Sequence, residues 1–560
     1  MRFNHSRISV PLLFCCLSLA LTAQALLPDV QERILKNGLR VLLVERPGIG
    51  AVHAQVFLRG GSADSAPLPP LAAELLAQSF IEAPSGGPWR ELETLLKQEE
   101  GAHEALRLAR LQQGRRGNAE PSAEDQELEA LEQRAFTRIR GLAKEASLQD
   151  PLARLGVTNR AAQAQADYLT WEADLPKEAL GAWCAQQTEL LRTPRLPWFP
   201  LERERMLHKL EHEPQSAHAS LSILLGTALT GRAYSQVWDF QRSAAEALTW
   251  SDMLAYARHG ISSERLLLVL VGDLKLPLIA RDLDTTLGSL PLDAESSHRL
   301  EDFSGDLSEA PGARRLQAST PRERRLLMAW RIPPLSHPET PLLQVMAQIL
   351  GGGRGSRLIR SVVMEKHLAK SLTVQMGLPG GRQTGLLLVE AVPETEHALG
   401  ELEQAIQGEV MRFQQEIIPE DEIRRAQRLV EADQVLAQED AARLATVLGA
   451  AQCEGGDWRL AFRGLQLTRD FSSEEIRGVA RRYLVPVQST TALLEPDPIL
   501  NPLDRQEAQL VRVLSQLLAP RLQDPAQAEG VIRETLRQIR MLPPADQQKT
   551  LKLLEAQVKP

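Results

Sequence analysis

The sequence contains few aromatic residues and has no excess of positive charge. Phe, Trp and Tyr make up 4% of its 560 residues, and the formal net charge at pH 7 is -8. Single-stranded nucleic acid is usually held by stacked aromatic rings, and duplex nucleic acid by basic patches. The composition therefore argues against a nucleic-acid-binding surface.

Long hydrophobic runs are also scarce, and the longest one stands at the N-terminus. Residues 1–25 combine basic Arg2 and Arg7, an apolar stretch over 10–21 and a small-x-small site ending at Ala25. This pattern is typical of a cleaved export signal, because an apolar run this short does not span a bilayer. We expect a periplasmic or secreted protein, cleaved near Ala25, with no membrane span after the signal is removed.

Cysteine is rare, which excludes a cysteine zinc site. Two of the four cysteines, Cys15 and Cys16, fall within the signal, and Cys184 and Cys453 stand far apart with no metal-ligand spacing. An exported protein can pair such residues, but buried free thiols are equally compatible with the sequence. Both alternatives stay open at this point.

The hydrophobic patterns divide the chain into two halves of similar layout. In residues 26–296, strands flank the turn Asn37-Gly38 and a helix begins at Leu71; residues 322–496 repeat this order in shorter form. A long helix is expected from Pro419 to Ala450. The remaining parts are predicted to be a helical hairpin insertion, a linker and a helical tail, over residues 89–148, 297–321 and 497–560.

One stretch contains a metal-ligand pattern, the H-x-x-E-H of His208, Glu211 and His212. On a helix these positions share one face, so two imidazoles could hold Zn²⁺ while the glutamate activates a bound water. A motif this short also arises by chance, and a charged, solvated helix without metal is the alternative.

Three sequence matches carry a family resemblance: Leu35 to Val41 (LKNGLRV), Arg59 to Asp64 (RGGSAD) and the helix from Leu71. Together they resemble the insulinase/pitrilysin family of metallopeptidases, which includes the mitochondrial processing peptidase. The resemblance continues through Gly351 to Leu358 in the second half. It implies an α+β fold of two homologous domains, each a mixed or antiparallel sheet packed with helices, which together form a clam-shell chamber.

The sequence departs from the family at the zinc motif. Aligned on Phe80, the two histidine positions hold Ala73 and Ala77, and the glutamate position holds Leu76. The family's third ligand follows a Glu-Arg pair by seven residues, which leads from Glu204 to Glu211. The resemblance therefore implies a protein without a cofactor, unless zinc binds at a relocated site built from Glu211, His208 and His212.

Other family positions are expected to face a substrate or a partner. Ala161 stands where the family has an asparagine on the substrate-binding edge strand, and Asp167 stands at a nearby aspartate position. Gly352 and Arg357 belong to the glycine-rich turn of the second half.

The expected function is that of a catalytically impaired subunit. Such a chain pairs with an H-x-x-E-H-bearing subunit, or with a second copy of itself, to bind and process peptides. Two alternatives remain: an active zinc endopeptidase at the relocated site, and a stand-alone peptide-binding clamp.

Overall fold

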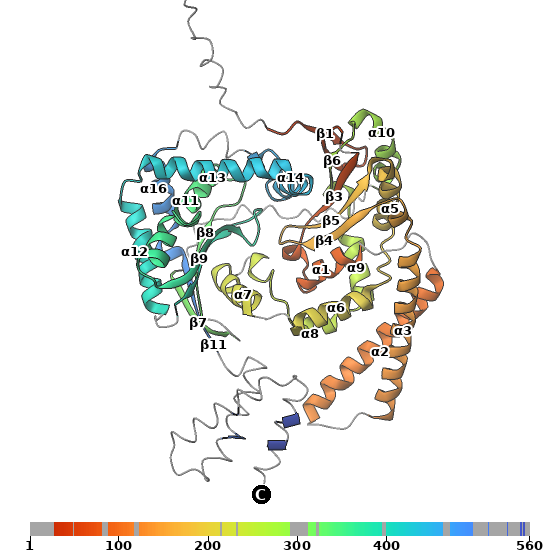
Figure 1. Cartoon of the computed structure of the whole chain (residues 1–560). Coiled ribbons are helices and arrows are strands. Elements are labelled where there is room, and N and C mark those ends of the chain that lie inside the picture. The colour runs from red at the N-terminus through yellow and green to blue at the C-terminus, as the bar shows by residue number, and fades with distance from the viewer. Residues whose placement is uncertain are drawn as a thin grey trace, which may run out of the picture.

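The computed structural model describes residues 27–496, apart from 49, 81–87, 117–121, 213–215, 231–232, 292–311, 321–323, 395–398 and 463–470, and a few isolated positions beyond 496. The predicted export signal and almost all of the predicted tail lie outside the described residues. Two sheets, each with its own helices, form the two halves of the chain (Figure 1). The predicted α+β fold is confirmed. Within the described part, no helix combines the length and apolarity that crossing a membrane requires.

The first sheet has six strands in the order β1-β2-β6-β3-β5-β4. The β2/β6 pair is parallel and the other pairs are antiparallel. Strand β6 is buried at every residue because it is central and both faces of the sheet are covered. The strands are β1 (Val30–Ile34), β2 (Arg40–Glu45), β3 (Ala51–Arg59), β4 (Thr158–Ala164), β5 (Tyr168–Pro176) and β6 (Leu266–Gly272).

The helices of the first half, apart from α7, pack on one face of this sheet and extend beyond it as a long hairpin of α2 and α3 (Figure 1). The hairpin ends nearest the sheet are apolar, with Leu96 of α2 and Ile139 of α3 in the first core. The helices are α1 (Leu71–Ser79), α2 (Trp89–Arg116), α3 (Ala123–Leu148), α4 (Pro151–Arg154), α5 (Leu180–Arg192), α6 (Phe199–His212), α7 (Ser216–Ala228), α8 (Arg242–Ala247), α9 (Trp250–Gly260) and α10 (Leu276–Thr285).

The second sheet has five strands in the order β7-β11-β8-β10-β9. Its edge strand β7 pairs in parallel with β11 and lies within residues 297–321, where the sequence predicts only a linker. Two positively charged residues open β7, and only Leu316 and Ala318 pack on a core, which explains the weak sequence signal. The strands are β7 (Arg314–Thr320), β8 (Arg325–Ile332), β9 (Ala369–Leu378), β10 (Gly385–Pro393) and β11 (Ser489–Pro496).

Each half contributes a helix to the other half's sheet. Helix α14 follows α13 but packs on the face of the first sheet, where Leu444 and Leu448 join the cluster of Phe57 and Val269. A Cβ at Gly449 would lie 2.0 Å from the Phe57 ring, so glycine lets the ring reach the helix backbone. Helix α7 covers the second sheet in the same way. The remaining helices of this half are α11 (Thr340–Gly351), α12 (Leu399–Gln415), α13 (Glu420–Glu439), α14 (Ala441–Gly455) and α16 (Ser473–Tyr483).

The single long helix predicted from Pro419 to Ala450 is wrong. Asp440 has extended backbone angles and caps α14, its side chain accepting a hydrogen bond from the Arg443 N–H at 2.7 Å. Aspartate is a favoured N-cap because its carboxylate satisfies an otherwise unpaired helix N–H. The break at Asp440 redirects α14 toward the first sheet.

Candidate functional site

Helix α1 occupies the place where the family resemblance locates the zinc motif. Ala73, Leu76 and Ala77 are at most 1% exposed and belong to the core of the first half. These three side chains contain no nitrogen, oxygen or sulfur atom that could bind a metal. The residues present do not fit a zinc ion, and no catalytic step can be assigned to zinc in α1.

Two polar residues of α1, Glu74 and Gln78, face the edge strand β4. Gln165 donates its N–H to the Tyr168 carbonyl of β5, so alternation points the backbone groups of Ala162 and Ala164 away from β5. Gln78 donates from Nε2 to the Ala162 carbonyl at 3.0 Å, and Glu74 accepts the Ala164 N–H at 3.3 Å. Two side chains one helical turn apart therefore occupy backbone groups that an added strand would use.

The H-x-x-E-H stretch lies at the end of α6. His208 is exposed, and Glu204, one turn earlier, forms an ion pair with Arg140 of α3 at 2.8 Å. The side chains of Glu211 and His212 lie outside the described residues, so their predicted role as metal ligands stays a prediction. The exposed face that carries Glu204 and His208 is directed away from the core.

A second Glu-Arg pair in α6 is the buried one. Glu202 and Arg203 are buried, whereas Arg205 of the other pair is exposed. Counting seven residues from Glu202 leads to Lys209 rather than to Glu211. The seven-residue spacing that identifies Glu211 as a ligand therefore starts from Glu204-Arg205, the pair that does not enter the core.

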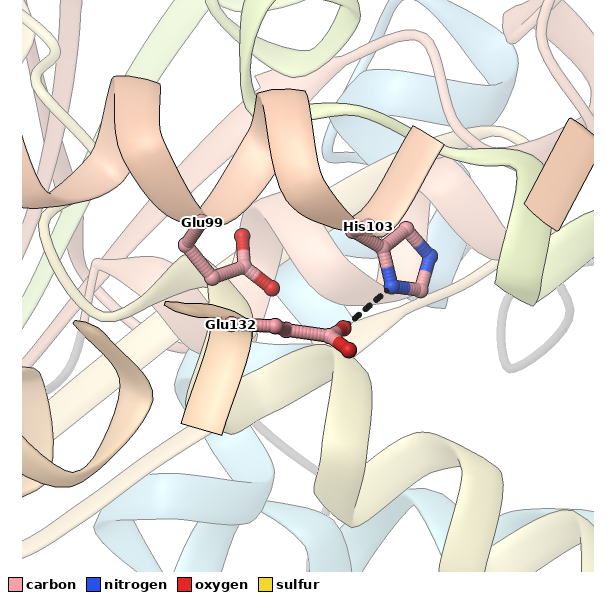
Figure 2. Close-up of side chains that lie close together, drawn as sticks. All are labelled: Glu99, His103 and Glu132. Atoms are coloured by element: carbon pink, nitrogen blue, oxygen red, sulfur yellow. Dashed lines mark hydrogen bonds and ion pairs between the residues drawn. The ribbon is translucent and has the colours of Figure 1, made fainter. Parts of the chain in front are cut away.

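Arg203 leads to a polar cluster that the sequence patterns missed. Its Nη2 lies 2.5 Å from Oε1 of Glu99 on α2, and Glu99 lies beside His103 of α2 and Glu132 of α3 (Figure 2). Nδ1 of His103 is 2.7 Å from Oε1 of Glu132. Burial raises the pKa of Glu99 although Arg203 opposes it. Glu99 and His103 are four residues apart in sequence, but only the hairpin register brings Glu132 to them.

A second buried ionic cluster joins the two halves of the chain. Arg382, from the β9–β10 turn, binds both carboxylate oxygens of Asp64 at 2.8 Å and lies 3.2 Å from Oδ1 of Asp167. Oδ2 of Asp167 accepts hydrogen bonds from the Tyr234 hydroxyl at 2.5 Å and from the Gly381 N–H at 3.0 Å. The sequence predicts that Asp167 faces a substrate or a partner. This prediction is wrong, because Asp167 is fully buried and contacts the second half of its own chain.

Glu454 of α14 borders this junction and gives it a pH dependence. Its Oε2 packs on Gly381, where a Cβ would approach to 2.2 Å, and burial, aided by the charge of Asp167, raises its pKa from 4.5 to about 8. A carboxyl whose pKa is higher in the folded state holds more protons than in the unfolded state. The stability it contributes is full below about pH 4.5 and is lost as the pH rises through 8.

We expect Glu454→Gln to remove this loss. At pH 8.5 the variant should be more stable than the natural chain by about 1–3 kcal/mol, less than the whole pKa shift implies, because the side chain is partly exposed. At pH 4 the two should be alike. Urea unfolding followed by circular dichroism at both pH values measures the difference, and parallel pH profiles would contradict the assignment.

The remaining predicted residues are placed as follows. Arg357 is buried and donates to Glu422 at 2.8 Å, so it stabilises the second half internally rather than facing a partner. Gly352 is partly exposed after α11, and Ala161 lies on edge strand β4. The remaining two cysteines are free and buried: Cys184 and Cys453.

Comparison with known proteins supports the family resemblance. A family model described as the peptidase M16 inactive domain matches residues 247–430. No curated protein matches the sequence.

Several solved structures have a similar fold. A protease from Helicobacter pylori is 16% identical with a TM-score of 0.66, covering 84% of this chain and 100% of that chain. A peptidase M16 inactive domain from Pseudomonas fluorescens is 15% identical with a TM-score of 0.63, covering 84% and 98%. The periplasmic protease PqqL from Escherichia coli is 12% identical with a TM-score of 0.57; the match covers 91% of this chain and 50% of PqqL.

The family match spans the end of the first half and most of the second, and the shared two-sheet fold extends over most of the chain. The motifs at 35–41 and 59–64 point to the same family. The chain therefore matches the M16 (insulinase/pitrilysin) peptidases in sequence over residues 247–430 and shares the fold of solved M16 structures, and the α1 residues at the place of the family's zinc motif have no metal-binding side chain.

Proposed function

We propose that this chain is an exported, catalytically impaired M16 subunit that pairs with an H-x-x-E-H-bearing subunit to bind and process peptides. The observation that carries the proposal is the closed packing of α1. Ala73 and Ala77 are fully buried among apolar neighbours, so the place of the reaction centre is part of the core. A chain built in this way needs a partner to supply the metal and the attacking water.

Export and peptide binding rest on separate features. The signal pattern of residues 1–25 supports export, and one protein of similar fold is a periplasmic protease. Peptides commonly bind by adding a strand to an exposed sheet edge, and β4 and β9 are edge strands. The chamber that would enclose the peptide forms, in this proposal, only with the partner subunit.

Co-expression tests the pairing. The mature chain is produced alone and together with an H-x-x-E-H-bearing M16 homologue from the same genome, and hydrolysis of a fluorogenic peptide library is measured. We expect a stable complex by light scattering, and hydrolysis that disappears when the partner's zinc ligands are replaced.

Each alternative predicts a different result. Zinc-dependent hydrolysis by this chain alone, abolished by His208→Ala, would establish the relocated endopeptidase site and overturn the proposal. Tight peptide binding by the chain alone, with no complex and no hydrolysis in the mixture, would instead establish the stand-alone clamp.

The hydrogen bonds from α1 to β4 give a further prediction. Replacing Glu74 and Gln78 by alanine frees the Ala164 N–H and the Ala162 carbonyl for an added strand. Two hydrogen bonds at about 1 kcal/mol each should tighten binding of an extended peptide by about tenfold or more. Fluorescence anisotropy with a labelled peptide measures the change.

Glu74→Gln is the matched control, since its amide oxygen still accepts the Ala164 N–H. The control should bind the peptide as the natural chain does. Unchanged or weaker binding by the Glu74→Ala/Gln78→Ala double variant would show that peptides do not pair with this part of β4.

A further inference from the structure

The cluster of Glu99, His103 and Glu132 places three metal-ligand atoms together on the α2–α3 hairpin. One atom from each side chain lies within 4.8 Å of the other two. Glu99 and His103 are one turn apart on α2, and Glu132 reaches them from α3, with its carboxylate directed at His103 (Figure 2). It is the one group of this kind among the described residues.

One oxygen of the cluster is buried without a partner. Glu99 is 1% exposed; its Oε1 is bound by Arg203, whereas its Oε2 has no hydrogen-bond donor. A buried carboxylate oxygen without a donor is costly, because it has lost water and gained nothing in exchange. The cost is removed if a cation binds Oε2.

The histidine presents the correct nitrogen to the carboxylates. Nε2 of His103 lies 2.9 Å from the Glu246 carbonyl oxygen, which can only accept, so Nε2 carries a hydrogen. Nδ1, the other ring nitrogen, points toward Glu132 and is the nitrogen available to bind a metal ion. Metal-binding histidines commonly donate their second N–H to a backbone carbonyl in this way, which fixes the ring and the tautomer.

We propose that Glu99, His103 and Glu132 bind a divalent transition-metal ion of the zinc type. One imidazole nitrogen and two carboxylate oxygens suit Zn²⁺, and water completes a tetrahedral shell. Mg²⁺ and Ca²⁺ prefer oxygen ligands, so a site that includes an imidazole nitrogen binds them poorly.

Charge and access are compatible with binding. Because Arg203 offsets Glu99, the two carboxylates and Arg203 together carry one net negative charge before the ion binds. The side chain of Glu132 is 26% exposed, so an ion can enter from solvent on that side. The bound ion would tie α2 to α3. The site lies outside α1 and does not depend on peptidase activity or on a partner subunit.

Zinc titration of the mature, tag-free, metal-stripped chain tests the proposal. By isothermal calorimetry we expect one Zn²⁺ per chain, with no comparable binding of Mg²⁺ or Ca²⁺. Loss of a residue that only hydrogen-bonds to a metal ligand weakens metal binding by about 10- to 100-fold, so loss of a ligand in Glu132→Gln or His103→Gln should weaken it about 100-fold or more. Zn²⁺ should also raise the thermal midpoint of the natural chain but not that of Glu132→Gln.

His208→Ala is the matched control, because it removes a histidine of the competing H-x-x-E-H stretch on α6. It should bind Zn²⁺ as the natural chain does. Glu132→Gln preserves the shape of the side chain, so it tests the role of the cluster in Zn²⁺ binding even if His103→Gln does not fold. Absence of saturable binding, binding unchanged in Glu132→Gln, or binding abolished by His208→Ala would each overturn the proposal.

Discussion

Replacing Arg382 by methionine should lower the free energy of unfolding by about 3–5 kcal/mol. Arg382 is the cation of the junction, where it contacts Asp64 at 2.8 Å and Asp167 at 3.2 Å. Its side chain is 2% exposed and that of Asp167 is fully buried, so neither charge is screened by water. Methionine preserves the bulk of the side chain but leaves the carboxylate of Asp167 buried without a counter-charge.

Urea unfolding measures the effect, and Arg315→Met is the control. Arg315 pairs with Glu403 at 3.0 Å, but its side chain is 59% exposed, so its loss should cost about 1 kcal/mol or less. Adding Asp64→Asn and Asp167→Asn to Arg382→Met should recover part of the stability, because it removes the uncompensated charges. Equal losses in the two arginine variants, with no recovery, would contradict a buried ionic junction.

The sequence predicts the architecture better than it predicts the way the halves are joined. The Asn37-Gly38 turn, the buried strand β6 and the glycine-rich turn at 351–358 are local patterns, and the α+β fold that they indicate is confirmed. The transfer of α14 to the first sheet depends on one capping residue, Asp440, within a stretch of good helix formers. Periodicity alone does not distinguish a continuous helix from two helices in sequence.

The junction and the hairpin cluster both join residues that are distant in sequence, so local patterns do not predict them. Arg382 is 318 residues from Asp64, and nothing local marks the two as partners. Asp167 occupies a family position in the sequence, but no local pattern identifies Arg382 as its partner. Glu99 and His103 have the spacing of ligands on one helix face, whereas Glu132 joins them only through the register of the hairpin. By contrast, the H-x-x-E-H stretch was conspicuous in sequence, and its described histidine, His208, is exposed.

Restoring the family's zinc motif in α1 should not restore a zinc site. In the triple variant Ala73→His/Leu76→Glu/Ala77→His, two imidazoles must enter positions that are fully buried as alanine. Overpacking costs about 1–3 kcal/mol at each such site, and the buried carboxylate adds to it, so we expect a loss of about 5 kcal/mol or more. Helix α1 packs on β4, β5 and α6 at once, which leaves it little room to shift.

The measurement is soluble yield and urea unfolding of the triple variant, with zinc-dependent peptide hydrolysis assayed on any folded fraction. Ala432→His is the control, because Ala432 is exposed on α13 and the same substitution there should change stability by about 0.5 kcal/mol or less. If the triple variant folds with near-natural stability and hydrolyses peptides, α1 still borders an open site, and this chain has lost only its ligands. If it unfolds while Ala432→His does not, the packing of α1 has closed around the small side chains. The impairment then belongs to the core of the protein, and changes confined to the three motif positions cannot reverse it.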